Sequence, residues 1–161
     1  MKFKYFCAFM LLSIASSAFA TSTKYLGSYE AIKNHLLKGG EIKIIVDDKT
    51  DCKLISKSGP IPYSPNTWSI NAKQFILKAK TGNIQIPVYP DFNPADSRYN
   101  MPPNYHTLDV IISPQGEITV EEQGISLIDY KVAMSIVTSC VIGDETHVGA
   151  KFIPYMRNSS E

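Results

Sequence analysis

The chain has 161 residues, with 16 Lys and Arg, 15 Asp and Glu and three histidines, so its formal net charge is only +1. No stretch concentrates positive charge, which binding to nucleic acid needs in order to displace counterions from phosphate. Composition therefore argues against nucleic acid as a partner.

The first 20 residues are typical of a secretory signal peptide. Lys2 and Lys4 give a charged start, Phe6–Ile14 is an apolar run, and Ala18-Phe19-Ala20 matches a small-residue cleavage site. The apolar run is about half of the roughly 20 residues that a membrane-spanning helix needs, and no later segment approaches that length. We therefore predict export by a signal peptide to the periplasm or the extracellular space, with no membrane span.

Cleavage after Ala20 leaves a chain of a length typical of one domain. We predict a single β-rich domain over residues 21–157 and a flexible tail over residues 158–161. Because Cys7 leaves with the leader, Cys52 and Cys140 are the cysteines that remain. Two cysteines in an oxidising compartment normally pair, so we predict a disulfide between them, with Cα atoms within about 7 Å.

The acidic residues around Cys52 invite other interpretations, but their spacing fits none of them. Asp47, Asp48 and Asp51 do not follow the alternation of an EF-hand calcium loop, and Cys52 has no second Cys or His within a few residues. Three nearby carboxylates would also disfavour a reactive thiolate. We interpret the stretch as a solvated turn, and predict no metal, no cofactor and no catalytic residue.

A short helix is predicted at the start of the domain. Ser28 is a good N-cap, and Lys38 followed by Gly39 suits a helix C-terminus. Three apolar side chains with helical spacing form the face that should meet the core: Tyr29, Ile32 and Leu36.

Strand character dominates the rest of the chain. Apolar residues alternate with others in Glu41–Asp47 and in the long run that ends near Cys140, and His106 falls in phase with the apolar residues that follow it. Pro87 suggests a sheet edge or a bulge. Seven or eight strands with one buried face predict a curled antiparallel sheet or small β-barrel, closed on one side by the helix.

The segment from Tyr89 to Asn104 is predicted as a long connection, because it holds four prolines and three aromatic residues. Loops of this length are commonly lids or binding loops. Aromatic and Arg side chains often anchor partners, so four residues are our candidates for partner binding: Tyr89, Phe92, Arg98 and Tyr99.

Two parts of the sequence resemble the VirK family of small secreted bacterial proteins. They are "YEAIKNHLLKGGEIKIIVDDKTDC" near the start of the domain, and "YKVAMSIVTSCVIG" followed by "VGAKFIPY" near its end. The resemblance implies export in a Gram-negative bacterium and an association with virulence toward a host. The family has no established reaction or catalytic residues, so the resemblance assigns none here.

The sequence favours a secreted or periplasmic module that is not an enzyme. We expect it to bind a protein or a small apolar ligand, through the open end of the sheet or through the aromatic loop. The alternative is a hydrolase that acts on envelope or host material, with Ser, His and Asp side chains that converge only in space.

Overall fold

The computed structural model describes residues 24–93 and 95–155, without the side chains of residues 89–91, so the predicted signal peptide and the tail at 158–161 lie outside it. The described elements, in chain order, are α1 (Tyr29–Leu37), β1 (Glu41–Asp47), β2 (Cys52–Ser58), β3 (Thr67–Ala72), β4 (Ile76–Leu77), β5 (Ile84–Asn93), the 3-10 helix η1 (Ser97–Tyr99), β6 (Asn104–Ile112), β7 (Glu117–Ser126), β8 (Val132–Gly143) and β9 (Ala150–Tyr155).

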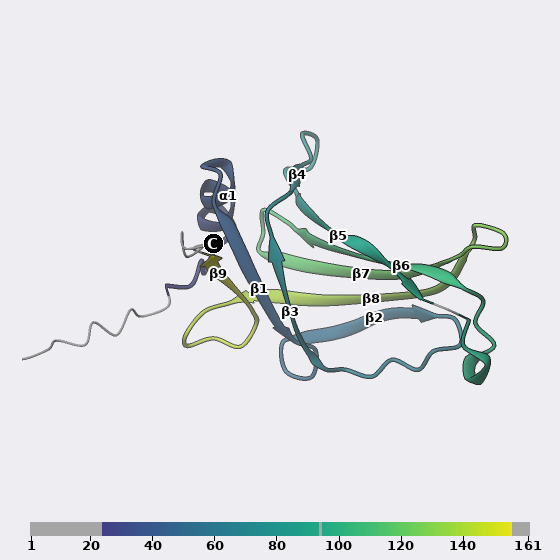
Figure 1. The fold of residues 1–161 in the computed structure, drawn as a ribbon. Coiled ribbons are helices and arrows are strands. Elements are labelled where there is room, and N and C mark those ends of the chain that lie inside the picture. Colours follow the sequence, from purple (N-terminus) through teal and green to yellow (C-terminus); the bar gives the residue numbers. More distant parts are fainter. Residues whose placement is uncertain (1–23, 94, 156–161) are drawn as a thin grey trace, which may run out of the picture.

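The strands form one curled sheet, an open half-barrel that α1 covers at one end (Figure 1). Their order is β3-β1-β9-β8-β7-β6-β5-β4, with β2 also paired to β8. The pairings are antiparallel except for two residue pairs between β8 and β9, where the 144–149 loop brings the chain back in the same direction. The predicted fold class, a curled sheet with one short helix, is confirmed.

Helix α1 forms as its sequence predicts. The Ser28 side chain accepts a hydrogen bond from the backbone N–H of Ala31 at 3.2 Å, and Gly39, just past the helix end, has the positive φ of +79° that glycine adopts at little cost. The predicted apolar face is buried, with Ile32 fully enclosed. This face holds the helix against the end of the half-barrel that carries β1.

The core is divided between the two ends of the half-barrel. The larger cluster lies beneath α1 and combines side chains from β1, β5, β6, β7, β8 and β9, with Phe152 as its largest fully buried member. The other end holds a much smaller buried cluster of Met101, Met134 and Ile136. Buried side chains therefore fill one end of the concave face, whereas at the other end they cover the sheet and leave space above it.

Strand β2 was not predicted. Its residues after Cys52 are exposed on both faces, and its two apolar residues, Leu54 and Ile55, are adjacent, so the sequence shows no period of two. Tertiary pairing creates the strand: β2 lies antiparallel to β8, with a bulge between Leu54 and Ser56. With β2 included, the sheet of the described residues has nine strands, one more than the higher number expected.

The disulfide between Cys52 and Cys140 is confirmed. The two residues face each other in the β2–β8 register, with their Cα atoms 4.2 Å apart. The acidic turn before Cys52 is itself anchored, because the Asp51 carboxylate accepts hydrogen bonds from the backbone N–H groups of Asp47 at 2.9 Å and Gly149 at 3.2 Å. The turn thus ties the end of β1 to the loop between β8 and β9.

The predicted loop from Tyr89 to Asn104 is wrong in its extent. Strand β5 continues to Asn93, where it pairs with Asn104 at the start of β6, after a register shift between Val88 and Asp91. A 3-10 turn and a bridge between Asp96 and Met101 order most of the remaining connection. Prolines were tolerated because β5 lies near the sheet edge, where a missing N–H costs little.

Candidate functional site

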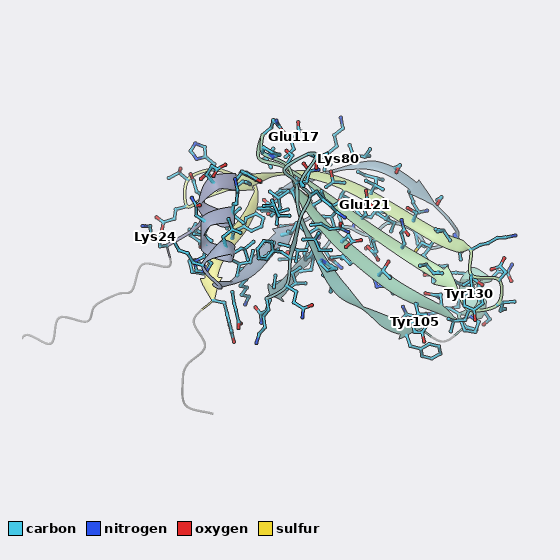
Figure 2. All side chains as sticks on the ribbon, turned by 90° about the horizontal axis from the view of Figure 1, so that it is seen from above. Lys24, Lys80, Tyr105, Glu117, Glu121 and Tyr130 are labelled. Carbon is cyan, nitrogen blue, oxygen red and sulfur yellow. A yellow bond between two sulfur atoms is a disulfide. The ribbon has the colours of Figure 1, made fainter. Side chains whose placement is uncertain are left out.

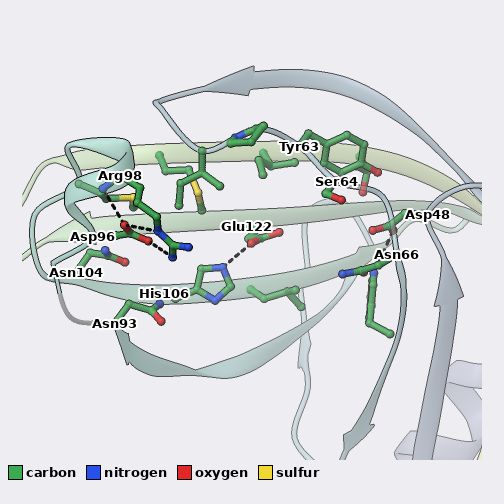
Figure 3. A pocket seen from close by; sticks show the side chains of 18 of the residues that line it. Asp48, Tyr63, Ser64, Asn66, Asn93, Asp96, Arg98, Asn104, His106 and Glu122 are labelled. Atoms are coloured by element: carbon green, nitrogen blue, oxygen red, sulfur yellow. Dashed lines mark hydrogen bonds and ion pairs between the residues drawn. The ribbon is translucent and has the colours of Figure 1, made fainter.

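A cavity of about 920 Å³ occupies the concave face at the end of the half-barrel away from α1 (Figure 3). Strands β6, β7 and β8 form its floor. The segment 61–66, between β2 and β3, forms one wall, and the connection after β5 that carries η1 forms another. The cavity thus lies over the part of the sheet that the main core does not fill.

The cavity floor begins where the inward-facing side chains of β6 and β7 change from apolar to polar along each strand. Alternate residues of β6 and β7 enter the main core as Val110, Ile112 and Ile118. The same rows continue through Leu108 and Val120, which border both the core and the cavity, and then change to His106 and Glu122. The cavity floor therefore mixes apolar and polar groups: Leu108, Val120, Met134, Ile136, His106 and Glu122.

His106 and Glu122 form a pair at the centre of the floor (Figure 3). The Nε2 atom of His106 lies 2.6 Å from Oε1 of Glu122, and about a third of each side chain or less is exposed. Gly124 lies opposite His106 in the β6–β7 register. A Cβ atom there would come within 2.9 Å of Met101 and 3.2 Å of Asn104, so this glycine leaves room for the side chains around the pair.

Asp48 lines the cavity at the end opposite to Arg98 (Figure 3). Its carboxylate accepts a hydrogen bond at 3.0 Å from the indole Nε1–H of Trp68, the single tryptophan of the chain. Burial raises the pKa of Asp48, and the nearby charge of Glu122 raises it further, although the bond from Trp68 opposes both. The pKa of Tyr63 is also raised, by burial first and then by Asp48 and Glu122. These groups therefore surround one region of the cavity.

The structure brings two of the predicted partner-binding residues together, since the Arg98 guanidinium lies over the Tyr99 ring, 5.6 Å from its centroid. Arg98 lines the cavity rim, where Asp96 holds its guanidinium through bonds of 3.1 Å and 2.8 Å and has its own pKa lowered by them. Tyr99 packs against the small buried cluster. Phe92 is exposed and meets the Tyr105 ring edge-on, with centroids 6.5 Å apart. The Tyr89 side chain lies outside the described part of the structure.

The outer face of the sheet also carries exposed apolar side chains at the end away from α1. Tyr105 of β6 lies there, Tyr130 lies nearby in the turn between β7 and β8 (Figure 2), and both are exposed. Tyr130 has a positive φ of +55°, an uncommon conformation for an aromatic residue, at the turn between β7 and β8. This surface is convex and lies on the opposite side of the sheet from the cavity floor.

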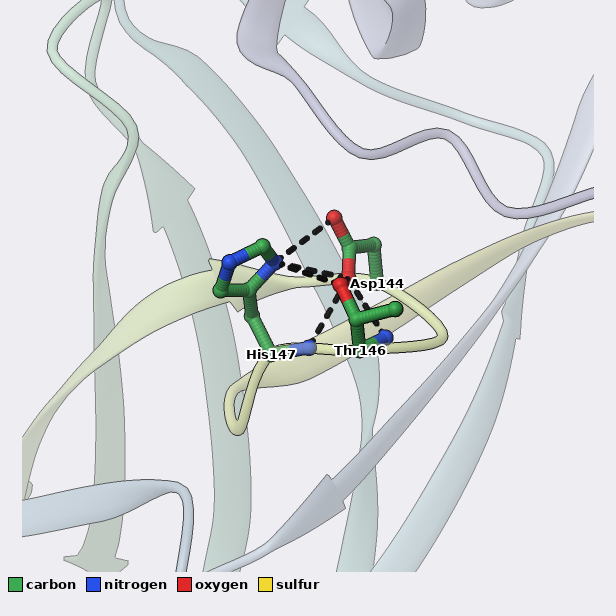
Figure 4. Close-up of polar contacts among 3 residues, drawn as sticks. All are labelled: Asp144, Thr146 and His147. Carbon is green, nitrogen blue, oxygen red and sulfur yellow. Dashed lines mark hydrogen bonds and ion pairs between the residues drawn. The ribbon is translucent and has the colours of Figure 1, made fainter.

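The other two histidines have local structural partners. His35 Nε2 lies 2.9 Å from the backbone oxygen of Glu41. His147 and Thr146 surround Asp144 in the exposed β8–β9 loop, where their backbone N–H groups donate to its carboxylate at 2.8 Å and 2.7 Å (Figure 4). These bonds hold the pKa of Asp144 well below its ordinary range. The loop is thus a hydrogen-bonded turn.

Residues 24–93 and 95–155 contain no group of three His, Cys, Asp or Glu side chains placed to hold a metal ion. The expectation that the protein binds no metal stays a prediction. In the same residues, no helix has both the length and the apolar character needed to cross a membrane.

Sequence reasoning missed Asp48, Glu122 and Trp68 as residues of one site. A partial signal was present, because His106 and Glu122 occupy positions in phase with apolar neighbours, where a buried side chain was expected. Asp48 carried no such signal, since it follows a strand in a turn where Asp is common.

Comparison with known proteins gives a likeness of fold. No family model and no curated protein matches the sequence. A solved structure of a VirK family protein from Legionella pneumophila superposes with a TM-score of 0.61 and 15% sequence identity, over 80% of this chain and 98% of that one. The chain therefore has the fold of a VirK family protein, as the sequence resemblance predicted.

Proposed function

We propose that this protein is an exported binding module, not an enzyme, whose concave face holds a small and largely apolar ligand. The observation that carries the proposal is the cavity of about 920 Å³ over a floor that includes Leu108, Val120, Met134 and Ile136. Pockets of roughly 300–1,000 Å³ with mostly apolar linings and a few placed polar groups are typical of small-molecule sites. The volume thus favours a small ligand over a protein partner.

Export and an association with virulence are part of the same proposal. A disulfide that closes a long loop fits an oxidising compartment, and the leader sequence supplies the route to it. The VirK-like fold supports a role in a Gram-negative bacterium that meets a host. Periplasmic location and release from the cell are equally consistent with a signal peptide.

We expect the neutral dye N-phenyl-1-naphthylamine to bind and to fluoresce more strongly, because the apolar part of the cavity floor shields it from water. Leu108→Trp should weaken this binding at least about tenfold, since the added bulk occupies the cavity floor. The matched control is Thr107→Trp, whose side chain lies on the other face of β6. Both variants should keep the circular dichroism of the parent. Equal dye binding by the two variants would contradict the proposal.

The alternative function is a hydrolase, and one observation favours it. The His106 ring and the Glu122 carboxylate are arranged like a general base and the group that orients it. Ser64 and Ser97 line the same cavity. Turnover of an eight-carbon p-nitrophenyl ester that is lost in His106→Gln would establish this alternative, whereas our proposal predicts stoichiometric binding without turnover.

A further inference from the structure

The charges that line the cavity do not balance. Three carboxylates, those of Asp48, Asp96 and Glu122, face two basic side chains, Arg98 and His106. The formal charge is therefore negative whether or not His106 is protonated. A cavity with one sign of charge and apolar walls attracts ligands of the opposite sign.

The positive charge of Arg98 at the cavity rim is already paired with Asp96. Asp96 holds the Arg98 guanidinium through two bonds, from Nε at 3.1 Å and from Nη2 at 2.8 Å, so that end of the cavity is close to neutral. Arg98 is also the most solvated of the charged groups, with 79% of its side chain exposed. It is consequently a poor anchor for the head group of an anionic ligand.

The negative charge that no Arg or Lys of the cavity lining neutralises lies elsewhere along the cavity, at Asp48 and Glu122. The Asp48 carboxylate accepts hydrogen bonds from the Trp68 indole N–H and from the backbone of Asn66, and no Lys or Arg side chain of the described residues acts on its pKa. Glu122 is paired with a histidine, which is neutral when deprotonated. Both carboxylates line the same cavity (Figure 3), and after burial the charge of Glu122 is a further cause that raises the pKa of Asp48. A cation placed between them would relieve this repulsion.

We propose that the ligand is an amphiphilic cation, a small molecule with an apolar body and an ammonium or similar group. The apolar body lies on the floor made by Leu108, Val120 and Ile136, and the cationic group lies between Asp48 and Glu122. This inference rests on the proposed binding function and adds the class of ligand to it.

The test compares three probes that share one chain length: octylamine, octan-1-ol and octanoate, titrated by calorimetry at pH 7.5. We expect octylamine to bind about tenfold more tightly than octan-1-ol, because a charged donor strengthens hydrogen bonds to carboxylates, and octanoate to bind most weakly. Asp48→Asn combined with Glu122→Gln should remove the preference for the amine. Asparagine at position 48 can still accept the bond from Trp68, so the fold should be kept.

The matched control is Glu121→Gln, which removes the neighbouring carboxylate from the outer face of β7 and should leave the amine preference unchanged. Equal affinity for the three probes, or tighter binding of octanoate, would overturn the ligand class while leaving the binding function intact. Failure of all three probes to bind would instead overturn the proposed function itself.

Discussion

Replacing Cys52 with Ala is expected to lower the free energy of unfolding by about 4–5 kcal/mol. The bond joins residues 88 positions apart, so removing it frees a long loop in the unfolded chain and increases the entropy of that state. Cys140 would remain as a buried thiol, which packs like a small apolar side chain. The folded state should therefore lose little packing.

The loss should also have a local signature in β2. Residues 53–58 are exposed, and the strand is held by its pairing with β8 and by the disulfide at its first residue. Without the bond, hydrogen exchange should quicken in β2 before it does in β7 or β8. Thermal unfolding should shift down by roughly 10–20 °C.

Reduction of the parent protein is the control for this substitution. A reductant should lower the stability of the parent to that of Cys52→Ala and leave the variant unchanged. Mature protein that has been denatured without reductant should show no reactive thiol. Two reactive thiols, or a parent whose melting temperature ignores the reductant, would contradict the assignment.

Phe152→Ala is expected to cost about 3–5 kcal/mol of unfolding free energy. Phe152 is fully buried and pairs with Ile44 across β1 and β9, in the cluster where α1 meets the sheet. Its truncation removes the largest fully buried side chain and leaves a space that the surrounding strands cannot fill without moving. Equilibrium unfolding in urea measures the loss.

The adjacent residue provides a matched comparison. Ile153 lies on the other face of β9 and is only partly buried, so Ile153→Ala should cost clearly less than Phe152→Ala. If the two substitutions were equally costly, the main core would not lie on the α1 side of β9. A functional outcome is expected as well, because the cavity lies at the other end of the sheet and dye binding at low temperature should survive both changes.

The parts of the fold that the sequence predicts are those whose side chains alternate against a single core. β1, β6 and β8 follow this rule, since Ile42, Ile44 and Val46 are buried while their neighbours are not. The helix was predicted because capping and spacing are local. β2 was not, because its pairing with β8 depends on a disulfide and a neighbour far away in the sequence.

The candidate site was harder to predict, because its residues come from separate segments. Asp48 follows β1, Trp68 lies in β3 and Glu122 in β7, and the curl of the sheet brings them to one cavity. Patterns of neighbouring residues in the sequence do not predict how far the sheet curls. The segment 89–104 was singled out for its aromatic residues, yet Phe92 lies within β5 and packs against Tyr105 on the exposed surface of the sheet.

The most direct test of the central claim is to map a bound ligand onto the sheet by NMR, with octan-1-ol as a neutral probe. We predict shifts in the indole N–H of Trp68 and in the side-chain signals of Leu108 and Ile136, which line the cavity. Shifts confined to Tyr105, on the outer face of β6, and to Tyr130, in the β7–β8 turn, would place binding away from the cavity and contradict the account.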